Sequence, residues 1–373
     1  MSGLSFMVKL LDGIAVEWKS LGDVCKIETG KLNANAAVEG GEFMFFTTAK
    51  ETSRINKYRW DTEALLIAGN ANVGEVKHYI GKFEAYQRTY VLTSFEKYID
   101  VRFLYFVLCN DLKKYLEERT NSAAMTYIVL STLEAFQIPI PCPENPKKSI
   151  EIQTEIIRIL DTFTELTAEL TAELTARKKQ YTYYRDQLLS FEEGDVEWKT
   201  LGEVGEILRG TAITEKETNP GEFPVVANGP SHNYYHDKSN RSGETIVIAR
   251  SGAYAGLVSY WNKPIFLTDA FSIHPNNKVL SSKFLYYMLK NDQTKIHNMG
   301  KGAGVPHVRA KEFESYKIPV PPLAEQARIV AILDKFDALT NSITEGLPRE
   351  IELRQKQYEY YRDLLLTFPR QEA

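Results

Sequence analysis

Apolar side chains recur every three or four positions along two long stretches of the chain. This spacing is typical of the buried seam of a coiled-coil helix. At 1.5 Å per residue, about 40 residues would form a rod of roughly 60 Å. The sequence therefore predicts two long helices, which most simply pack against each other. The seam positions are Ile152, Ile156, Ile159, Phe163, Leu166, Leu170, Leu174, Tyr181, Tyr184, Leu188 and Phe191, then Ile329, Leu333, Phe336, Leu339, Ile343, Leu347, Ile351, Tyr358, Tyr361, Leu365 and Phe368.

Prolines mark where both helices begin. They occur within residues 139–143 and 319–322, and proline favours extended backbone and the first helical turn. Gly346 and Pro348 interrupt the second stretch, which predicts a kink or a break there.

Shorter apolar runs lie outside these helices. Residues 223–229 and 244–252 are typical of strands that end in turns. Residues 281–299 and their counterpart 102–120 predict helices. The fold class is therefore α+β, with two mixed globular domains separated and followed by long helices. The predicted boundaries are 1–149, 150–193, 194–321 and 322–373.

The second half of the chain repeats the first. Residues 16–30 (VEWKSLGDVCKIETG) and 196–210 (VEWKTLGEVGEILRG) are identical at nine of fifteen positions, and the helices share KQYxYYRDxLLxF at 179–191 and 356–368. A period this long indicates a duplicated domain with its helix. The polar loops do not repeat: Asn33 and Lys50 have no obvious counterpart in the second copy. This suggests two binding domains for different ligands, held at a fixed separation.

These motifs, in this order, resemble the specificity subunit of type I restriction–modification systems. The resemblance rests on the opening motif VEWKxLG(D/E)V, the closing motif IPxPxxxEQxxIxxxLD, the tyrosine-rich motif and the repeat TEL-TAEL-TAEL-TAR at 164–177. It covers essentially the whole chain. The closing motif is cleanest in the second copy. In the first copy Gln153 stands where Gln326 does, and the extra residues ENPKKSIE precede it.

The resemblance implies a non-catalytic subunit with two target recognition domains, each of which reads one half of a bipartite duplex DNA site. The helices would form an antiparallel coiled coil that sets the spacer and docks two adenine methyltransferase subunits. Restriction subunits, which would cleave DNA, are further partners whose presence the sequence leaves open. S-adenosylmethionine, ATP and Mg²⁺ would belong to the partners, with no cofactor in this chain. Four residues of rod add roughly 6 Å, about two base-pair steps.

Composition excludes several other classes. The chain has 373 residues, of which 43% are hydrophobic and 25% charged, the ordinary globular range. No uncharged apolar run approaches the ~20 residues of a membrane span, and we identify no signal peptide. Three cysteines without CxxC spacing argue against structural zinc and a disulfide framework. They favour a reducing cytoplasm, and the lack of an apolar run of membrane-spanning length predicts a protein that contacts no membrane.

Charge is distributed unevenly. The net charge is −4, but residues 150–195 carry 5 basic and 10 acidic residues, whereas residues 196–317 carry 15 basic and 12 acidic ones. The first helix is therefore acidic, which leaves the globular domains free to present a positive face.

Polar and basic loop residues are the candidate DNA contacts. Arginine and lysine suit guanine or phosphate, and asparagine suits adenine. The alternative is that these side chains satisfy backbone turns or merely solubilise the surface. The candidates are Lys31, Asn33, Lys50, Asn70, Asn72, Arg88, Arg209, Asn228, His232, Tyr234, Arg250, Tyr254, Lys301 and His307.

Catalytic and metal motifs are weak by comparison. His232 and His236 have HxxxH spacing, but their flanks are typical of a loop, so a recognition loop or a solvated loop is favoured over zinc. The glycine-rich residues 300–304 follow a predicted helix and do not match a phosphate-binding loop. They suit close approach to a DNA backbone or a structural turn. We find no methyltransferase cofactor loop and no catalytic tetrad of the Asn-Pro-Pro-aromatic type.

The tyrosine-rich motifs are predicted to serve packing and partner contacts. The assigned partner-binding residues are Tyr181, Tyr184, Leu188, Tyr358, Tyr361 and Leu365. Trp18 and Trp198 occupy identical repeat positions and are both predicted to pack in the scaffold. The alternative function is a coiled-coil adaptor whose duplicated domains bind proteins or glycans, for which the net charge of −4 is the best support.

Overall fold

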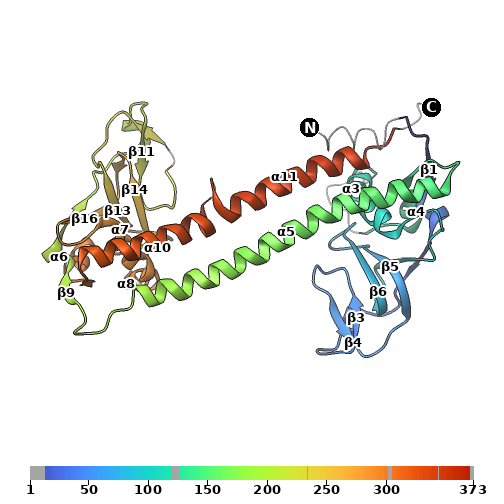
Figure 1. The fold of residues 1–373 in the computed structure, drawn as a ribbon, viewed down its shortest axis with the longest axis horizontal. Helices are drawn as coiled ribbons and strands as arrows, with labels where there is room; N and C mark the ends of the chain where they lie inside the picture. Colours follow the sequence, from blue (N-terminus) through green and yellow to red (C-terminus); the bar gives the residue numbers. More distant parts are fainter. Residues whose placement is uncertain (1–12, 120–126, 233, 301–304, 343, 370–373) are drawn as a thin grey trace. The chain divides into compact units, whose positions relative to one another are not determined.

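The chain forms two compact units, each built around one globular domain (Figure 1). This computed structural model describes residues 13–119, 127–232, 234–300, 305–342 and 344–369. Unit 1 comprises residues 1–169 and 351–373, and unit 2 comprises residues 170–350. Each unit thus combines a domain with parts of the long helices.

A six-stranded sheet forms the centre of unit 1. Its middle strand β5 is buried on both faces: Leu65 and Ile67 face a core shared with α3 (Val101–Glu118), and Ala64 and Leu66 face a second apolar cluster. A strand covered on both faces needs an uninterrupted apolar run, which explains ALLIA at 64–68. The strand order is β2 (Lys26–Thr29), β7 (Thr89–Thr93), β5 (Trp60–Ala68), β6 (Val76–Ala85), β3 (Phe43–Phe46) and β4 (Ser53–Ile55).

Unit 2 repeats the first four strands of this order and places the remaining strands in a separate sheet. The predicted strands at 223–229 and 244–252 are confirmed as β11 and β13. The four-stranded sheet has the order β10 (Gly205–Arg209), β16 (Ala270–Pro275), β13 (Glu244–Ala249), β14 (Val258–Asn262), and the three-stranded sheet has the order β12 (Tyr235–His236), β11 (Phe223–Val226), β15 (Phe266–Leu267).

The helices of the two domains differ in continuity. The predicted helix at 102–120 is confirmed as α3. The predicted single helix at 281–299 is instead two helices, α7 (Ser282–Asn291) and α8 (Gln293–Met299). Asp292 lies between them with ψ of 12°, and its Oδ2 accepts a hydrogen bond from the Tyr316 hydroxyl at 2.5 Å. The contact links the junction between the two helices to Tyr316.

The opening and closing motifs of each copy pair with each other. Trp18 lies opposite Pro139 in one antiparallel pair, and Trp198 lies opposite Pro319 in the other. Proline is tolerated because each of these sheets has only two strands, both of them edges. The elements are β1 (Val16–Ser20), β8 (Gln137–Pro141), β9 (Glu197–Thr200) and β17 (Lys317–Val320), with the short helices α2 (Leu21–Val24), α4 (Leu130–Glu134), α6 (Leu201–Val204) and α9 (Ala310–Glu314) and the 3₁₀ turns η1 (Ala34–Ala36) and η2 (Glu215–Glu217).

The two repeated tryptophans have different surroundings. Trp18 packs against the core of unit 1, and its Nε1 donates to the Pro369 carbonyl at 3.1 Å. Strand β1 and the residues that follow α11 therefore meet in unit 1. Trp198 is 40% exposed, so the prediction of equal packing is wrong for it.

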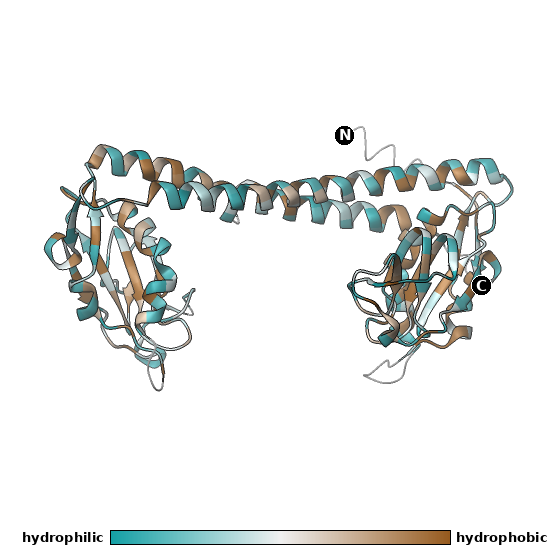
Figure 2. Cartoon of the chain, turned by 90° about the horizontal axis from the view of Figure 1, so that it is seen from below, coloured by the Kyte–Doolittle hydropathy of each residue, from teal (hydrophilic) through white to brown (hydrophobic). Residues whose placement is uncertain are grey.

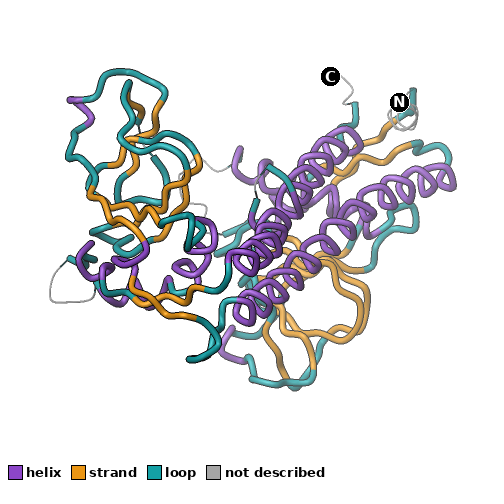
Figure 3. The backbone as a smooth tube through the Cα atoms, turned by 60° about the vertical axis from the view of Figure 1, so that its left-hand side comes forward, coloured by secondary structure: helices purple, strands orange, loops and turns teal. Residues whose placement is uncertain are grey.

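The long helices pack in antiparallel fashion within each unit (Figures 1 and 3). In unit 1, α11 (Gly346–Leu366) runs beside the first part of α5 (Pro146–Leu188), with Tyr361 stacked on Phe163 at 5.2 Å between ring centroids. In unit 2, Phe336 of α10 (Leu323–Asn341) contacts Tyr181 and Tyr184 of α5. These contacts confirm the predicted seams among the described residues, and the seam position Ile343 lies outside them. In Figure 2, hydrophobic positions interrupt otherwise hydrophilic helices.

The predicted interruption of the second long helix is confirmed. α10 ends at Asn341 and α11 begins at Gly346. Gly346 has φ of +73°, and a Cβ atom there would lie 2.3 Å from the Ala338 carbonyl oxygen. Glycine is therefore required at this turn, because any side chain would be both strained and blocked.

Candidate nucleic-acid interface

A polar cluster in unit 2 lies where β11 and β13 end and β16 begins. Asn228 follows β11, Arg250 and Ser251 follow β13, and Asp269 precedes β16. The Asn228 amide donates to Ser251 Oγ at 2.9 Å and to Asp269 Oδ2 at 2.6 Å, and its oxygen accepts from the Arg250 backbone N–H at 2.6 Å. The Arg250 guanidinium pairs with Asp269. An arginine, an amide and a carboxylate are thus held together on a loop surface.

Two further predicted residues lie beside this cluster. Ser251 forms an isolated antiparallel bridge with His307, which is exposed. Tyr254 follows in the same loop and is 51% exposed. The structure therefore brings Asn228, Arg250, Tyr254 and His307 to one region, as a shared recognition surface requires.

The Arg250–Asp269 ion pair is exposed, with about half of each side chain open to solvent. Surface pairs of this kind contribute only ~0–1 kcal/mol to stability. Arg250 and Asp269 can therefore separate and contact another molecule with little loss of folding stability.

Unit 1 carries a cluster of different chemistry at the equivalent place. The strand ends correspond, because Ala68 pairs with Thr89 in unit 1 and Ala249 pairs with Ala270 in unit 2. Asn70 follows β5 and bridges to Tyr127, and the Arg88 guanidinium lies 5.9 Å from the Tyr127 ring centroid. Asn70 and Tyr127 thus occupy the places of Ser251 and His307.

A cavity of about 280 Å³ opens beside the cluster in unit 1. The Tyr90 hydroxyl donates to the Ile128 carbonyl at 2.8 Å, and burial raises the pKa of this phenol, so it remains a proton donor at neutral pH. Among the described residues, Asn70 Oδ1 is a buried oxygen with no hydrogen-bond partner, which leaves an acceptor unused. The cavity is lined by Thr29, Gly69, Gln87, Arg88, Tyr90, Tyr127 and Ile128.

Residues 31–33 lie next to this cavity. Leu32 bridges to Tyr86, and its carbonyl accepts from the Gln87 N–H at 2.9 Å. Lys31 and Asn33 flank Leu32 and are both exposed. They are therefore brought toward Arg88, although 55 or more residues separate them in sequence.

Other predicted contacts are engaged in the fold or lie apart. The Asn72 amide donates to the Thr48 carbonyl at 2.8 Å. This hydrogen bond joins two loops of the domain and engages the amide in the fold. Lys50 is exposed in the loop that contains Thr48, and Arg209 is exposed at the end of β10. Tyr234 is partly buried before β12. Lys301 lies outside the described residues.

The two histidines of the HxxxH spacing have separate partners. His232 Nε2 lies 2.9 Å from the Tyr235 hydroxyl, whereas His236 is buried and contacts Asn219 and Asp237. In the described part of the chain, no group of three or more His, Cys, Asp or Glu side chains is placed to hold a metal ion.

Sequence reasoning missed Tyr127, Ser251 and Asp269 of the two clusters, and Gln87 of the cavity beside one of them. None lies in a repeated motif. Asp269 corresponds to Arg88, and Tyr127 to His307, once the strands are aligned by their pairing. An alignment of the two copies that matches paired strand positions would therefore have identified Tyr127 and Asp269 as equivalents of predicted contacts.

Comparison with known proteins decides the family. The profile described as type I restriction modification DNA specificity domain matches twice, at residues 15–177 and 193–353. The chain belongs to this family of type I specificity subunits. It is 38% identical to the Escherichia coli type I restriction enzyme EcoR124I/EcoR124II specificity subunit, over 100% of this chain and 99% of the relative. It is 34% identical to the EcoprrI specificity subunit of Escherichia coli, over 92% and 93%.

Solved structures of the same class share the fold. The S subunit of a type I restriction–modification system from M. genitalium superposes with a TM-score of 0.69 at 20% identity and covers 98% of this chain and 99% of its own. A chain from a structural study of type I R-M complex assembly superposes with a TM-score of 0.60 at 15% identity, over 95% and 98%. At these identities the likeness concerns the fold alone.

The long helices of this specificity subunit place its predicted partner residues in different surroundings. Tyr181, Leu188, Tyr358 and Tyr361 are half-buried, and Tyr184 is 42% exposed. Leu365 is fully buried in the core of unit 1, in a cluster that includes residues of α3 and α5. Its side chain is therefore closed to a partner in this conformation.

The most exposed tyrosines of the repeated motif were not among the predicted contacts. Tyr183 is 62% exposed and Tyr360 is 54% exposed. Each packs edge-on against the next tyrosine of its own helix. They stand at equivalent positions of the two copies, so the repeated motif could have identified them as candidate partner contacts.

No helix in the described part of the chain combines the length and the hydropathy that a bilayer-crossing segment requires.

Proposed function

We propose that this specificity subunit reads a bipartite duplex DNA site, with residues 16–137 on one half-site and residues 196–317 on the other. The observation that carries the proposal is the pair of clusters at equivalent strand ends. Arg88, Asn70 and Tyr127 stand in one, and Arg250 and His307 stand in the other. One scaffold with two sets of hydrogen-bonding side chains suits recognition of two different base sequences.

The proposal assigns the long helices to spacing and assembly. The antiparallel pair would set the spacer and dock two methyltransferase subunits, which methylate adenine. Exposed Tyr183, Tyr184 and Tyr360 supply aromatic area, which is enriched at protein interfaces. Restriction subunits are further candidate partners of the same complex. S-adenosylmethionine, ATP and Mg²⁺ would be bound by these partners.

The testing experiment is to purify the chain with candidate methyltransferase subunits and to map adenine methylation across a genome. A split motif is expected, and exchange of residues 16–137 or 196–317 for those of a relative should alter one half of it. Absence of methylation, together with absence of duplex binding at low salt by a folded complex, would overturn the proposal. That result would favour the adaptor with protein- or glycan-binding domains.

A further inference from the structure

The same buried glutamine joins domain to long helix in both units. Gln153 of α5 and Gln326 of α10 are each 0% exposed. Gln153 Oε1 accepts from the Asp100 N–H at 2.8 Å, and its Nε2 donates to the Tyr98 carbonyl at 2.9 Å. Asp100 caps the N-terminus of α3. The amide therefore holds the first turn of the domain helix by its backbone.

Gln326 repeats this arrangement with the same geometry. Its Oε1 accepts from the Ser281 N–H at 2.8 Å, and its Nε2 donates to the Val279 carbonyl at 2.9 Å. Ser281 caps α7, and Val279, like Tyr98, lies two residues before the cap. Because the contacts are made to backbone atoms, they are maintained although the side chains around them differ between the copies.

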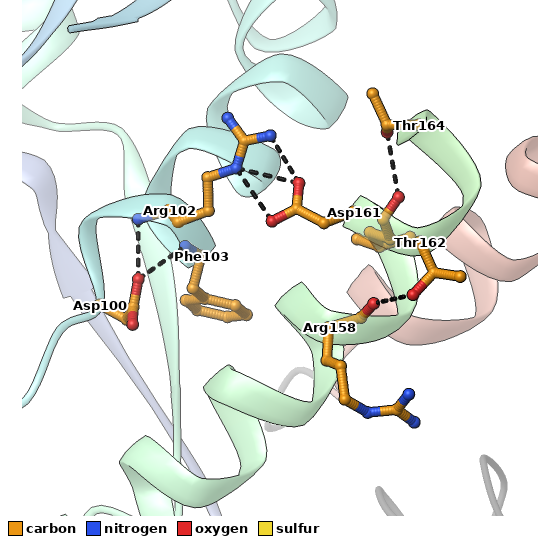
Figure 4. A network of polar contacts seen from close by, with 8 residues as sticks. Asp100, Arg102, Phe103, Arg158, Asp161, Thr162 and Thr164 are labelled. Atoms are coloured by element: carbon orange, nitrogen blue, oxygen red, sulfur yellow. Dashed lines mark hydrogen bonds and ion pairs between the residues drawn. The ribbon is translucent and has the colours of Figure 1, made fainter. Parts of the chain in front are cut away.

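A second anchor lies eight residues farther along each long helix, about 12 Å away. In unit 1, Arg102 donates to Asp161 through Nε at 3.1 Å and through Nη2 at 2.5 Å (Figure 4). In unit 2, Lys283 Nζ lies 3.2 Å from Asp334 Oδ1, and the Tyr287 hydroxyl also donates to Asp334. Arg102 and Lys283 each stand two residues after the helix cap.

Two anchors fix both the position and the direction of the domain helix on the long helix, whereas one anchor would permit rotation about it. We call each pair of anchors a clamp: Gln153 with Asp161 in unit 1, and Gln326 with Asp334 in unit 2. α3 shares its core with β5 and β7, whose ends carry the unit 1 cluster. α7 likewise shares its core with β13 and β16. A change of angle at a clamp is therefore transmitted to the cluster.

We propose that Gln153 and Gln326 are positioning residues that determine which half-site spacing the subunit accepts. The inference rests on the proposed function. It separates two determinants of spacing: the length of the long helices, and the angle at which each domain is clamped to them. The clamp residues are buried or turned toward the domain helix, so they would act on DNA recognition without touching DNA.

The test measures methylation by the complex of this chain with its methyltransferase subunits. The substrates are duplexes with both half-sites unchanged and spacers that differ by one base pair. In Gln153→Ala and Gln326→Ala, the ratio of rates between the preferred spacer and its neighbours should fall by about 10- to 100-fold, because a misplacement of a reacting group by about 1 Å can cost about 100-fold in rate. The bases preferred within each half-site should stay the same.

Asp161→Asn is the milder companion variant, because it keeps an acceptor oxygen for Arg102 and leaves Gln153 intact. It should lower the same ratio in a protein that folds normally. Arg158→Ala and Arg328→Ala are the matched controls, since each removes an exposed arginine that pairs with a glutamate of its own helix. Both controls should keep the wild-type ratio.

The outcomes separate this inference from the proposed function. A uniform loss of rate at every spacer in the glutamine variants, with an unchanged ratio in Asp161→Asn, would show a purely structural role and overturn the inference alone. If wild-type complex binds and methylates no split site, the proposed function fails and the inference fails with it.

Discussion

At the scale of single residues, the two domains carry different side chains at equivalent strand ends. Arg88 and Asp269 precede equivalent strands, so one domain presents a cation where the other presents a carboxylate paired with Arg250. Arg88 lies over the Tyr127 ring and Arg250 is paired with a carboxylate, so the two arginines should differ in affinity for a phosphate or a guanine edge. The two half-sites should therefore depend on these residues separately.

Arg88→Ala is expected to weaken discrimination at one half-site by about 1–3 kcal/mol, the usual contribution of an arginine that contacts bases. The other half-site should be unaffected. Binding titrations of the complex with duplexes altered in either half-site measure both effects. Arg59→Ala is the control, because Arg59 also lies over an aromatic ring, that of Trp60 at 4.8 Å, but outside the cluster. An equal loss at both half-sites would contradict the assignment.

Asp269→Asn should increase affinity for DNA that lacks the target sequence. The substitution removes the charge that neutralises Arg250, while asparagine tolerates the positive φ of +45° at this position. One more cation available to phosphate should steepen the plot of log binding constant against log salt by about 0.9. A salt titration on non-target duplex measures this slope, and an unchanged slope would mean that Arg250 does not face DNA.

The residues of the clusters were only partly predictable from sequence. Asn70, Arg88, Asn228 and Arg250 were found because they follow or precede recognisable strand patterns. Asp269 was not predicted, because its hydrogen-bond partner Asn228 is 41 residues away in the sequence. The burial of Leu365 depends on packing against α5, which periodicity alone does not distinguish from an exposed seam position.

At the scale of elements, the turn between α10 and α11 shows how one residue ends a helix. Gly346 combines a positive φ with a backbone oxygen 2.3 Å from the place of a Cβ atom. A positive φ costs a non-glycine residue roughly 1–2 kcal/mol, and the obstruction adds to this. The interruption is therefore an intrinsic feature of the second long helix.

Gly346→Ala is expected to lower the free energy of unfolding by more than about 2 kcal/mol, because strain and obstruction act together. Gly243→Ala is the matched control, since Gly243 has φ of +68° but open space around its Cβ position. It should lose only the strain contribution. Urea unfolding of the two variants, monitored by circular dichroism, provides the comparison. Equal losses of unfolding free energy would show that the Ala338 carbonyl moves aside at little cost.

At the scale of the whole molecule, the long helix α5 is continuous from Pro146 to Leu188 and contains the TAEL repeats. Its leucines at 166, 170 and 174 are half-buried at steps of four. A four-residue deletion thus shortens the helix and leaves this spacing intact. The length of α5 can be changed without changing either recognition domain.

Deletion of Thr171–Leu174 is expected to shift the preferred spacer and to leave both half-site sequences intact. Four residues correspond to roughly 6 Å of helix, about two base-pair steps. Methylation mapping of the complex identifies the new spacer. Glu173→Ala, which lies in the same repeat and keeps the helix length, should retain the original one. Altered half-site sequences would refute the separation of spacing from reading.

The sequence by itself determined the duplication, the two helical seams, the break at Gly346 and the strands β11 and β13. These features are encoded by periodicity, proline and glycine over a few neighbouring residues, so they can be inferred locally. Only the tertiary structure decided that VEWK pairs with the proline segment more than 100 residues later, that Asp292 divides a helix, and that Gln153 and Gln326 hold the domain helices. These contacts join residues distant in sequence, and their free energy is realised only when packing brings both partners together.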